Sequence, residues 1–122
     1  MNELDQLLTD YKAGNTTRLE MLSQLVALPV ILPSANEIDA EGAGYQPLVF
    51  DRFGAHMVAA FSNEELAAKY ADSHPYLKAI TAGAFIELLK PGFGLVLNPH
   101  LETSLEMVPE FLKNLRAGMQ PR

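Results

Sequence analysis

Residues 88–99 constrain the fold of this chain more than any other stretch. They read Leu-Leu-Lys-Pro-Gly-Phe-Gly-Leu-Val-Leu-Asn-Pro, in which a helix end, a turn, an apolar strand and a second turn follow directly. Pro91 cannot continue a helix and Pro91-Gly92 is a turn dipeptide, so a helix must end just before it. The apolar run from Phe93 to Leu97 is short enough to be a buried strand. We therefore expect helices and strands to share one core.

The start of the chain predicts a pair of helices. Apolar residues follow the i, i+3, i+4, i+7 spacing of one helix face between residues 2 and 13, at Leu4, Leu7, Leu8 and Tyr11. Thr17 and Glu20 have the spacing of a capping box, which opens a second helix that Pro29 must stop. Residues 30–32 then read as a short strand.

The middle of the chain predicts a loop, two strands and a helix. Residues 34–46 carry glycines and isolated acidic side chains and read as a loop. Residues 46–50 and 56–61 are predicted as antiparallel strands joined by a turn at 51–54. Ser62 and Glu65 have the spacing of a second capping box, so a helix is expected from there to about Asp72.

The last third completes the expected fold. Residues 76–80 read as a strand, and residues 82–89 as a short helix with Phe85, Leu88 and Leu89 facing inward. Residues 104–108 alternate as a half-exposed strand, and Pro109 suits the first position of a last helix. The pattern predicts a single α+β domain: a mostly antiparallel or mixed sheet covered by helices, with an N-terminal helical pair.

Composition excludes several classes of function. The 122 residues fit one domain, and the formal net charge is −6 at pH 7. A nucleic-acid backbone or an anionic membrane needs a concentrated basic surface, so neither is expected as a partner. No apolar run is long enough to span a bilayer, and the acidic start is unlike a signal peptide. The absence of cysteine suits a reducing compartment, which predicts a cytoplasmic location.

The residues that could carry chemistry have simpler structural interpretations. His100 with Glu102 and Glu106 could ligate a metal, but no histidine pair fixes a geometry. Ser62 lacks the Gly-x-Ser-x-Gly pattern of a nucleophile and suits a helix cap. Glu64-Glu65 suits the first turn of a helix, where adjacent side chains point about 100° apart. We therefore expect no catalytic residue, no metal and no cofactor.

Two features leave a binding role open. Gly92-Phe93-Gly94 precedes a strand and opens no helix, so it is a turn rather than a phosphate loop, although its glycines allow close approach of a ligand or backbone. The apolar stripe of the first helix must pack on its own domain, which we favour, or on another subunit. The residues predicted as partner or ligand contacts are Leu4, Leu8, Tyr11, Tyr45, Phe53, His56, Phe93 and His100.

Several segments in order along the chain resemble the N-terminal domain of the SseB family, named after a bacterial protein linked to enhanced serine sensitivity. They are Leu-Pro-Val-Ile-Leu-Pro at 28–33, Pro-Leu-Val-Phe at 47–50, Val-Ala-Ala-Phe-Ser-Asn-Glu-Glu-Leu-Ala at 58–67, Pro-Tyr-Leu at 75–77, and residues 88–99 with their continuation at 104–109. The resemblance runs from about Leu19 to Leu115. It predicts a helical extension at 1–16, the SseB-like domain at 17–118 and a tail at 119–122.

The resemblance implies a fold but no reaction, because the family has no catalytic residues to carry over. Some of its labels mention type III secretion, and longer members carry a second C-terminal domain for which this chain leaves no room. We predict a non-enzymatic module that binds a protein partner or a second copy of itself. The alternative is a small metabolite-binding protein or enzyme with a pocket near the strand ends, around His56, Glu64 and His100.

Overall fold

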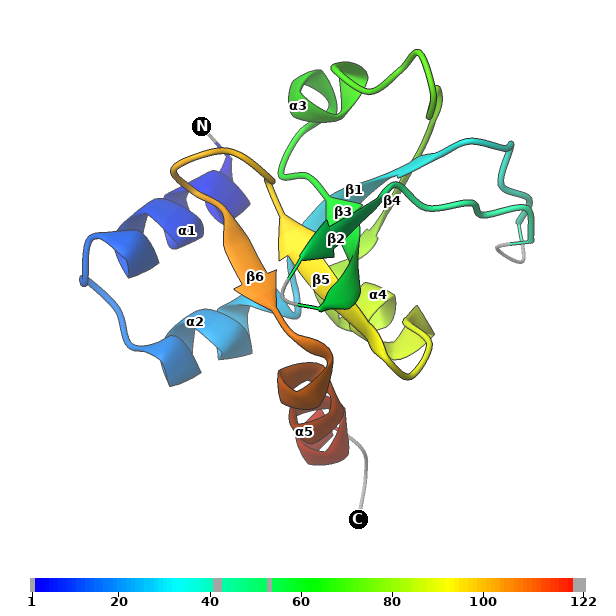
Figure 1. The fold of residues 1–122 in the computed structure, drawn as a ribbon. Helices are drawn as coiled ribbons and strands as arrows, with labels where there is room; N and C mark the ends of the chain where they lie inside the picture. Colours follow the sequence, from blue (N-terminus) through cyan, green and yellow to red (C-terminus); the bar gives the residue numbers. More distant parts are fainter. Residues whose placement is uncertain (1, 41–42, 53, 120–122) are drawn as a thin grey trace.

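The computed structural model describes residues 2–40, 43–52 and 54–119 (Figure 1). In this part of the chain the helices are α1 (Glu3–Lys12), α2 (Arg18–Leu25), α3 (Glu64–Ala68), α4 (Ala82–Leu88) and α5 (Pro109–Met119), and the strands are β1 (Pro29–Ser34), β2 (Val49–Arg52), β3 (Ala55–Ala60), β4 (Tyr76–Thr81), β5 (Phe93–Leu97) and β6 (Leu105–Met107). The predicted α+β fold with an N-terminal helical pair is confirmed. No helix in the described part is long and apolar enough to cross a membrane.

The strands form one mixed and one antiparallel sheet. The four-stranded sheet has the order β2-β3-β5-β6, in which β3 and β5 are parallel and both outer pairs are antiparallel. The two-stranded sheet pairs β1 with β4 antiparallel. Single bridges from Ile31 to Phe61 and from Ser34 to Pro47 connect the two sheets. The two sheets are therefore joined in one fold through β1.

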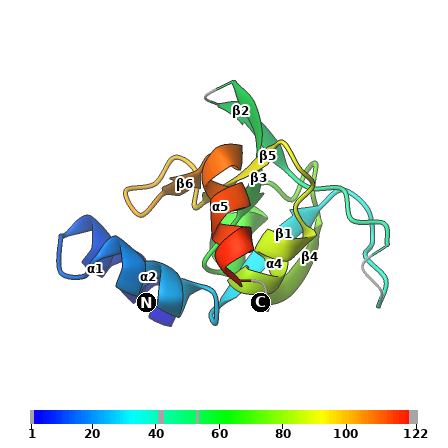
Figure 2. The same cartoon turned by 90° about the horizontal axis from the view of Figure 1, so that it is seen from below.

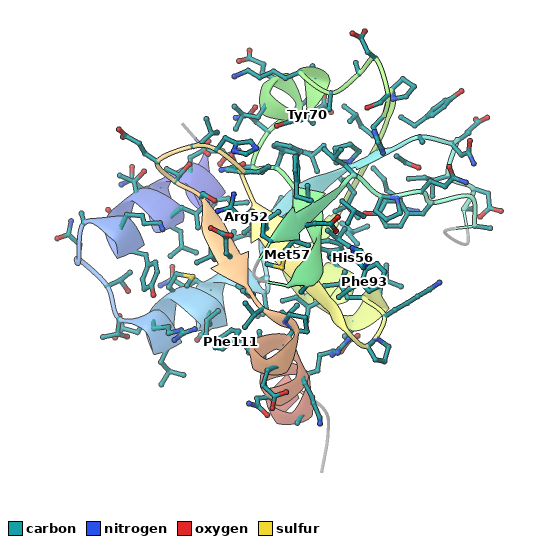
Figure 3. All side chains as sticks on the ribbon, viewed as in Figure 1. Arg52, His56, Met57, Tyr70, Phe93 and Phe111 are labelled. Atoms are coloured by element: carbon teal, nitrogen blue, oxygen red, sulfur yellow. The ribbon has the colours of Figure 1, made fainter. Side chains whose placement is uncertain are left out.

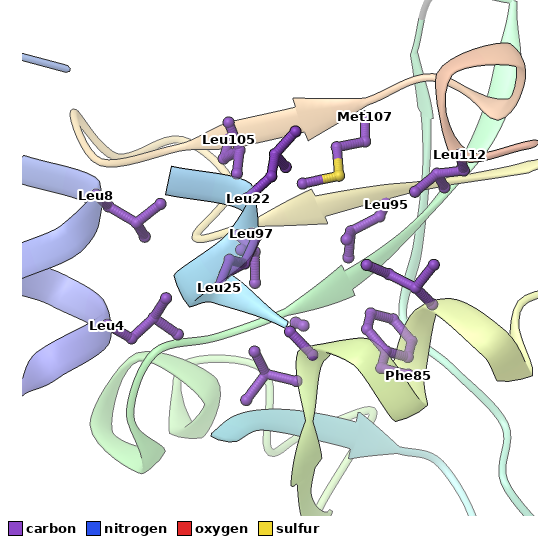
Figure 4. Packing of buried hydrophobic residues seen from close by; sticks show 14 of the residues in the cluster. Leu4, Leu8, Leu22, Leu25, Phe85, Leu95, Leu97, Leu105, Met107 and Leu112 are labelled. Carbon is purple, nitrogen blue, oxygen red and sulfur yellow. The ribbon is translucent and has the colours of Figure 1, made fainter. Parts of the chain in front are cut away.

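Apolar side chains cover both faces of the mixed sheet. Leu95 and Leu97 of β5 belong to the main cluster (Figure 4), whose other side chains come from α1, α2, α4 and α5 and from β1, β3 and β6. Figure 2 shows how these helices lie around the sheet. Met57 and Val96 belong to a smaller cluster that receives side chains from α3 and β2. The stripe of α1 packs into the main cluster, with Leu8 fully buried. This confirms our preferred prediction that the first helix docks on its own domain.

The turn that opens β5 has the geometry that its sequence predicts. The Phe93 amide donates to the carbonyl of Lys90 at 3.1 Å, and Gly92 has a φ of 88°. Proline followed by a glycine in the left-handed region makes a type II turn. Gly94 is required for a different reason, because a Cβ at that position would lie 2.8 Å from the Met107 carbonyl oxygen of β6.

Three expectations for the local structure are wrong. Asn63, not Ser62, caps α3, and its side chain accepts a hydrogen bond from the Leu66 amide at 2.9 Å. α3 also ends at Ala68, before Asp72. Leu88 is exposed because α4 turns Phe85 and Ile86 toward the core instead.

Two further element boundaries differ from those expected. The second helix ends at Leu25, because the amides of Ala27 and Leu28 form the tighter i→i−3 type of bond before Pro29. The first hairpin strand runs from Val49 to Arg52, so two residues expected in the turn belong to the ladder instead. Arg52 is held there by an ion pair with Glu106, at 2.8 Å between Nε and Oε2.

Candidate functional site

An apolar cavity of about 300 Å³ lies between α4, the start of β5 and the segment that leads into β2. We call it the Tyr45 cavity, and its lining residues are Tyr45, Pro47, Val58, Phe85, Leu88, Leu89, Lys90 and Phe93. The proline-glycine turn that ends α4 returns the chain into β5, which brings Leu88 and Phe93 to the same cavity. The lining comes from residues 45–47, from Val58 of β3 and from the continuous stretch 85–93.

The hydroxyl of Tyr45 is the unusual group in this cavity. Its oxygen is buried, and it has no hydrogen-bond partner in the described part of the chain. Burial raises the pKa of the phenol above its usual value, so the hydroxyl stays protonated at physiological pH. A buried polar atom without a partner costs free energy of folding.

The mouth of the cavity carries an exposed apolar side chain beside a cation. Leu88 is 67% exposed, and Lys90 is exposed close by. Arg116 of α5 donates from Nη1 to the Leu89 carbonyl oxygen at 2.6 Å, which anchors the end of α4. The mouth is therefore held by a hydrogen bond between two helices.

His56 lies next to the cavity but does not line it. Its ring is 5.7 Å from the ring of Phe93, measured between centroids, and Figure 3 shows the two together where β3 and β5 begin. Its Nδ1 shares a hydrogen bond with the carboxylate of Asp51. Of the predicted contact residues, Tyr45 and Phe93 line one cavity. His56 packs against Phe93 beside that cavity.

His100 lies at the other end of the sheet. It follows the carboxyl end of β5, whereas His56 lies at the amino end of β3, and these strands are parallel. The His100 ring packs edge-on against Phe50 with a centroid distance of 5.5 Å. The expected pocket around His56, Glu64 and His100 therefore does not form.

The remaining predicted contacts do not form a common surface. Leu4 and Leu8 are buried in the main cluster, and Tyr11 is half-buried against it. Phe53 lies outside the described residues. In the described part of the chain, no group of three or more histidine or carboxylate side chains could hold a metal ion.

A buried polar cluster escaped the sequence reasoning. Asn98 accepts a hydrogen bond from the Ser62 amide at 2.9 Å through Oδ1 and donates to the Ser62 hydroxyl at 3.1 Å through Nδ2. The Ser62 hydroxyl donates to the Asp5 carboxylate, and the Asn2 side chain donates to the Ser62 carbonyl at 2.6 Å. The cluster ties the start of α1 to the ends of β3 and β5, which is a structural role.

The fold and the site define a class: a single-domain α+β protein with an apolar cavity between a helix and a mixed sheet. The family model described as SseB protein N-terminal domain matches residues 4–114. The chain therefore belongs to the SseB family. Searches of curated proteins and of solved structures found no match. The family match includes α1, and the boundary that we predicted at residue 17 stays a prediction.

Proposed function

We propose that this chain is a non-enzymatic binding module that receives an apolar side chain of a partner protein in the Tyr45 cavity. The observation that carries the proposal is Leu88, which is 67% exposed at the mouth of an apolar cavity. Fully burying a leucine side chain contributes roughly 1.5–3 kcal/mol, so a partner that covers this mouth gains affinity there. Central apolar anchors in pockets are typical of protein interfaces.

The chemistry of the lining supports binding over catalysis. General acid–base or nucleophilic catalysis needs a titrating group, or a nucleophile with a base within hydrogen-bond reach. The described residues that line the cavity include no carboxylate, histidine, serine or threonine. The Tyr45 phenol is held protonated, and Lys90 stands at the mouth. These groups suit recognition of a ligand rather than its conversion.

A second candidate function is binding of a small apolar metabolite in the same cavity. The apolar, concave lining of the cavity favours it, because small-molecule sites are concave and mostly apolar. A thermal-shift screen tests this candidate, since a ligand of the folded chain raises its melting temperature. A hit whose shift is lost in Leu88→Asn but kept in Leu19→Asn supports the metabolite. A screen without any shift removes it.

Capture from a lysate of the source cells tests the protein partner. We expect the immobilised chain to retain a partner in a saturable way and Leu88→Asn to lose it. Leu19→Asn is the matched control, because Leu19 is also exposed, at 79%, but lies on α2 outside the cavity. Equal retention by both variants would contradict the proposed site. Retention of the chain itself alone would indicate a homo-oligomer.

We also propose a cytoplasmic location, which the cysteine-free composition supports. Fluorescence imaging of a tagged chain in its source cells measures this. Signal confined to the cell envelope would contradict it.

A further inference from the structure

β4 is an edge strand whose outward backbone groups can be assigned from the hydrogen bonds of β1. The Ile31 amide and carbonyl both bond to Phe61, so they point away from β4. Antiparallel pairs alternate between bonded and non-bonded, and the register pairs Ile31 with Ala79. The amides of Leu77 and Ala79 therefore point outward, whereas those of Lys78 and Ile80 face β1.

β1 and β4 differ at the positions whose backbone groups face away from the partner strand. In β1, Pro29 and Pro33 occupy positions whose backbone nitrogens face away from β4, and proline has no N–H to offer there. Proline at such positions blocks pairing with another chain. β4 (Figure 2) has no proline or glycine within it, and both Leu77 and Ala79 are exposed. No strand of the described chain pairs with its outer edge, and residues 37–40 line a hollow together with Tyr76, Leu77 and Lys78.

Lys78 indicates what kind of strand fits this edge. It is half-buried in the middle of β4, and in the described part of the chain it makes no ion pair. A strand added to the edge would place one side chain directly opposite Lys78, in a non-bonded pair where side chains are closest. An acidic side chain is favourable there and a basic one is not. Apolar residues on either side would lie beside Leu77, which is 39% exposed, and Ala79.

We propose that the open edge of β4 pairs with an extended segment of a partner protein that reads apolar, acidic, apolar opposite Leu77, Lys78 and Ala79. A second copy of β4 does not fit, because its sequence Tyr-Leu-Lys-Ala-Ile-Thr has no carboxylate to place opposite Lys78 in any register. The edge shares no residue with the Tyr45 cavity. The two proposals can therefore fail independently.

Synthetic peptides with the core Thr-Val-Glu-Val-Thr or Thr-Val-Lys-Val-Thr, titrated into the isotope-labelled chain, test this proposal by NMR. We expect the glutamate peptide to slow hydrogen exchange at the Leu77 and Ala79 amides and to bind about three- to fivefold more tightly than the lysine peptide. Lys78→Glu should reverse this preference. Unchanged exchange at both amides, or equal affinities for the two peptides, would overturn the proposal.

A backbone variant isolates the strand pairing itself. Ala79→Pro removes the outward N–H while the bonds to β1 run through Lys78 and Ile80, and Ala79→Ser keeps that N–H as the matched control. The proline variant should lose peptide binding and the serine variant should keep it. If the proline variant does not fold, the reversed preference of Lys78→Glu between the two peptides still tests the proposal. A chain that dimerises alone with both amides protected would overturn the proposal in favour of a second copy.

Discussion

At the scale of single residues, Tyr45 connects the stability of the fold to its proposed function. Tyr45→Phe removes only a buried oxygen that has no partner in the described chain. We expect it to raise the free energy of unfolding by up to about 1 kcal/mol at neutral pH, because this oxygen is then no longer buried without a partner. Urea denaturation measures this. A loss of 1 kcal/mol or more would show that the hydroxyl is bonded within the fold.

The raised pKa of Tyr45 also predicts a pH dependence of stability. Below about pH 10, the phenol is protonated in both the folded and the unfolded chain, so it contributes no dependence. Above that pH, the unfolded chain loses the proton while the folded chain keeps it, and stability falls by about 1.4 kcal/mol per pH unit. The difference between wild type and Tyr45→Phe in alkaline urea titrations isolates this effect. Parallel curves for the two proteins would contradict it.

Gly94 should be intolerant of a side chain. In Gly94→Ala the new Cβ would lie 2.3 Å from the Met57 sulfur, which can move, and 2.8 Å from the Met107 carbonyl oxygen, which belongs to a paired strand. We expect a loss of about 1–3 kcal/mol of unfolding free energy. Gly118→Ala is the control, because its Cβ meets nothing within 4 Å in α5 and should be neutral or stabilising. Equal stabilities would show that β5 and β6 separate easily.

At the scale of elements, Asn98 supports the attachment of α1 by holding Ser62, to which Asn2 and Asp5 bond. Asn98 is fully buried with a φ of 49°, and Asn98→Ala would leave the Ser62 amide without its acceptor and place alanine in the left-handed region. We expect a loss of about 2–4 kcal/mol. Hydrogen exchange should also speed up in α1 more than in α5. Asn98→Gly removes the backbone strain of the alanine variant but does not restore the hydrogen bonds to Ser62. Full stability of the glycine variant would therefore contradict the role of the Asn98 side chain.

Local patterns predicted the elements well, and distant partners caused the misses. Thr17 caps its helix and Pro109 opens the last one as expected, because both signals lie within one turn of the backbone that they serve. Ser62 also had a complete capping motif, yet it bonds to Asn98 and Asp5, and the neighbouring Asn63 took the cap. Sequence spacing cannot rank a local cap against a partner in a distant segment.

At the scale of the whole molecule, the site depends on pairings that no local pattern specifies. The cavity forms because β5 lies parallel to β3 while α4 packs over their starting ends, which brings Tyr45 and Phe93 together. The sequence marked both residues as aromatics near loops but could not show that they meet. Nor could the sequence show that Leu88 is exposed and Leu89 buried, because this depends on the rotation of α4 about its axis.

The open edge of β4 is likewise a property of the whole fold. Strand 76–80 was expected from its sequence, but its exposure depends on β1 being its neighbour in a two-stranded sheet. Pro29 and Pro33 of β1 lie where the backbone nitrogens face away from β4, so neither proline removes a hydrogen bond from that pairing. β4, unlike β1, keeps an N–H at each position whose backbone groups face away from its partner strand.

The most direct test of the central claim is site-specific photocrosslinking from position 88 in the source cells. A photoreactive residue replacing Leu88 should form one crosslinked product that excess wild-type chain competes away and Leu88→Asn chain does not. The same residue at position 19 should give no such product, because Leu19 is exposed on α2 outside the cavity. No crosslink at position 88, or the same products from both positions, would contradict the Tyr45 cavity as the binding site.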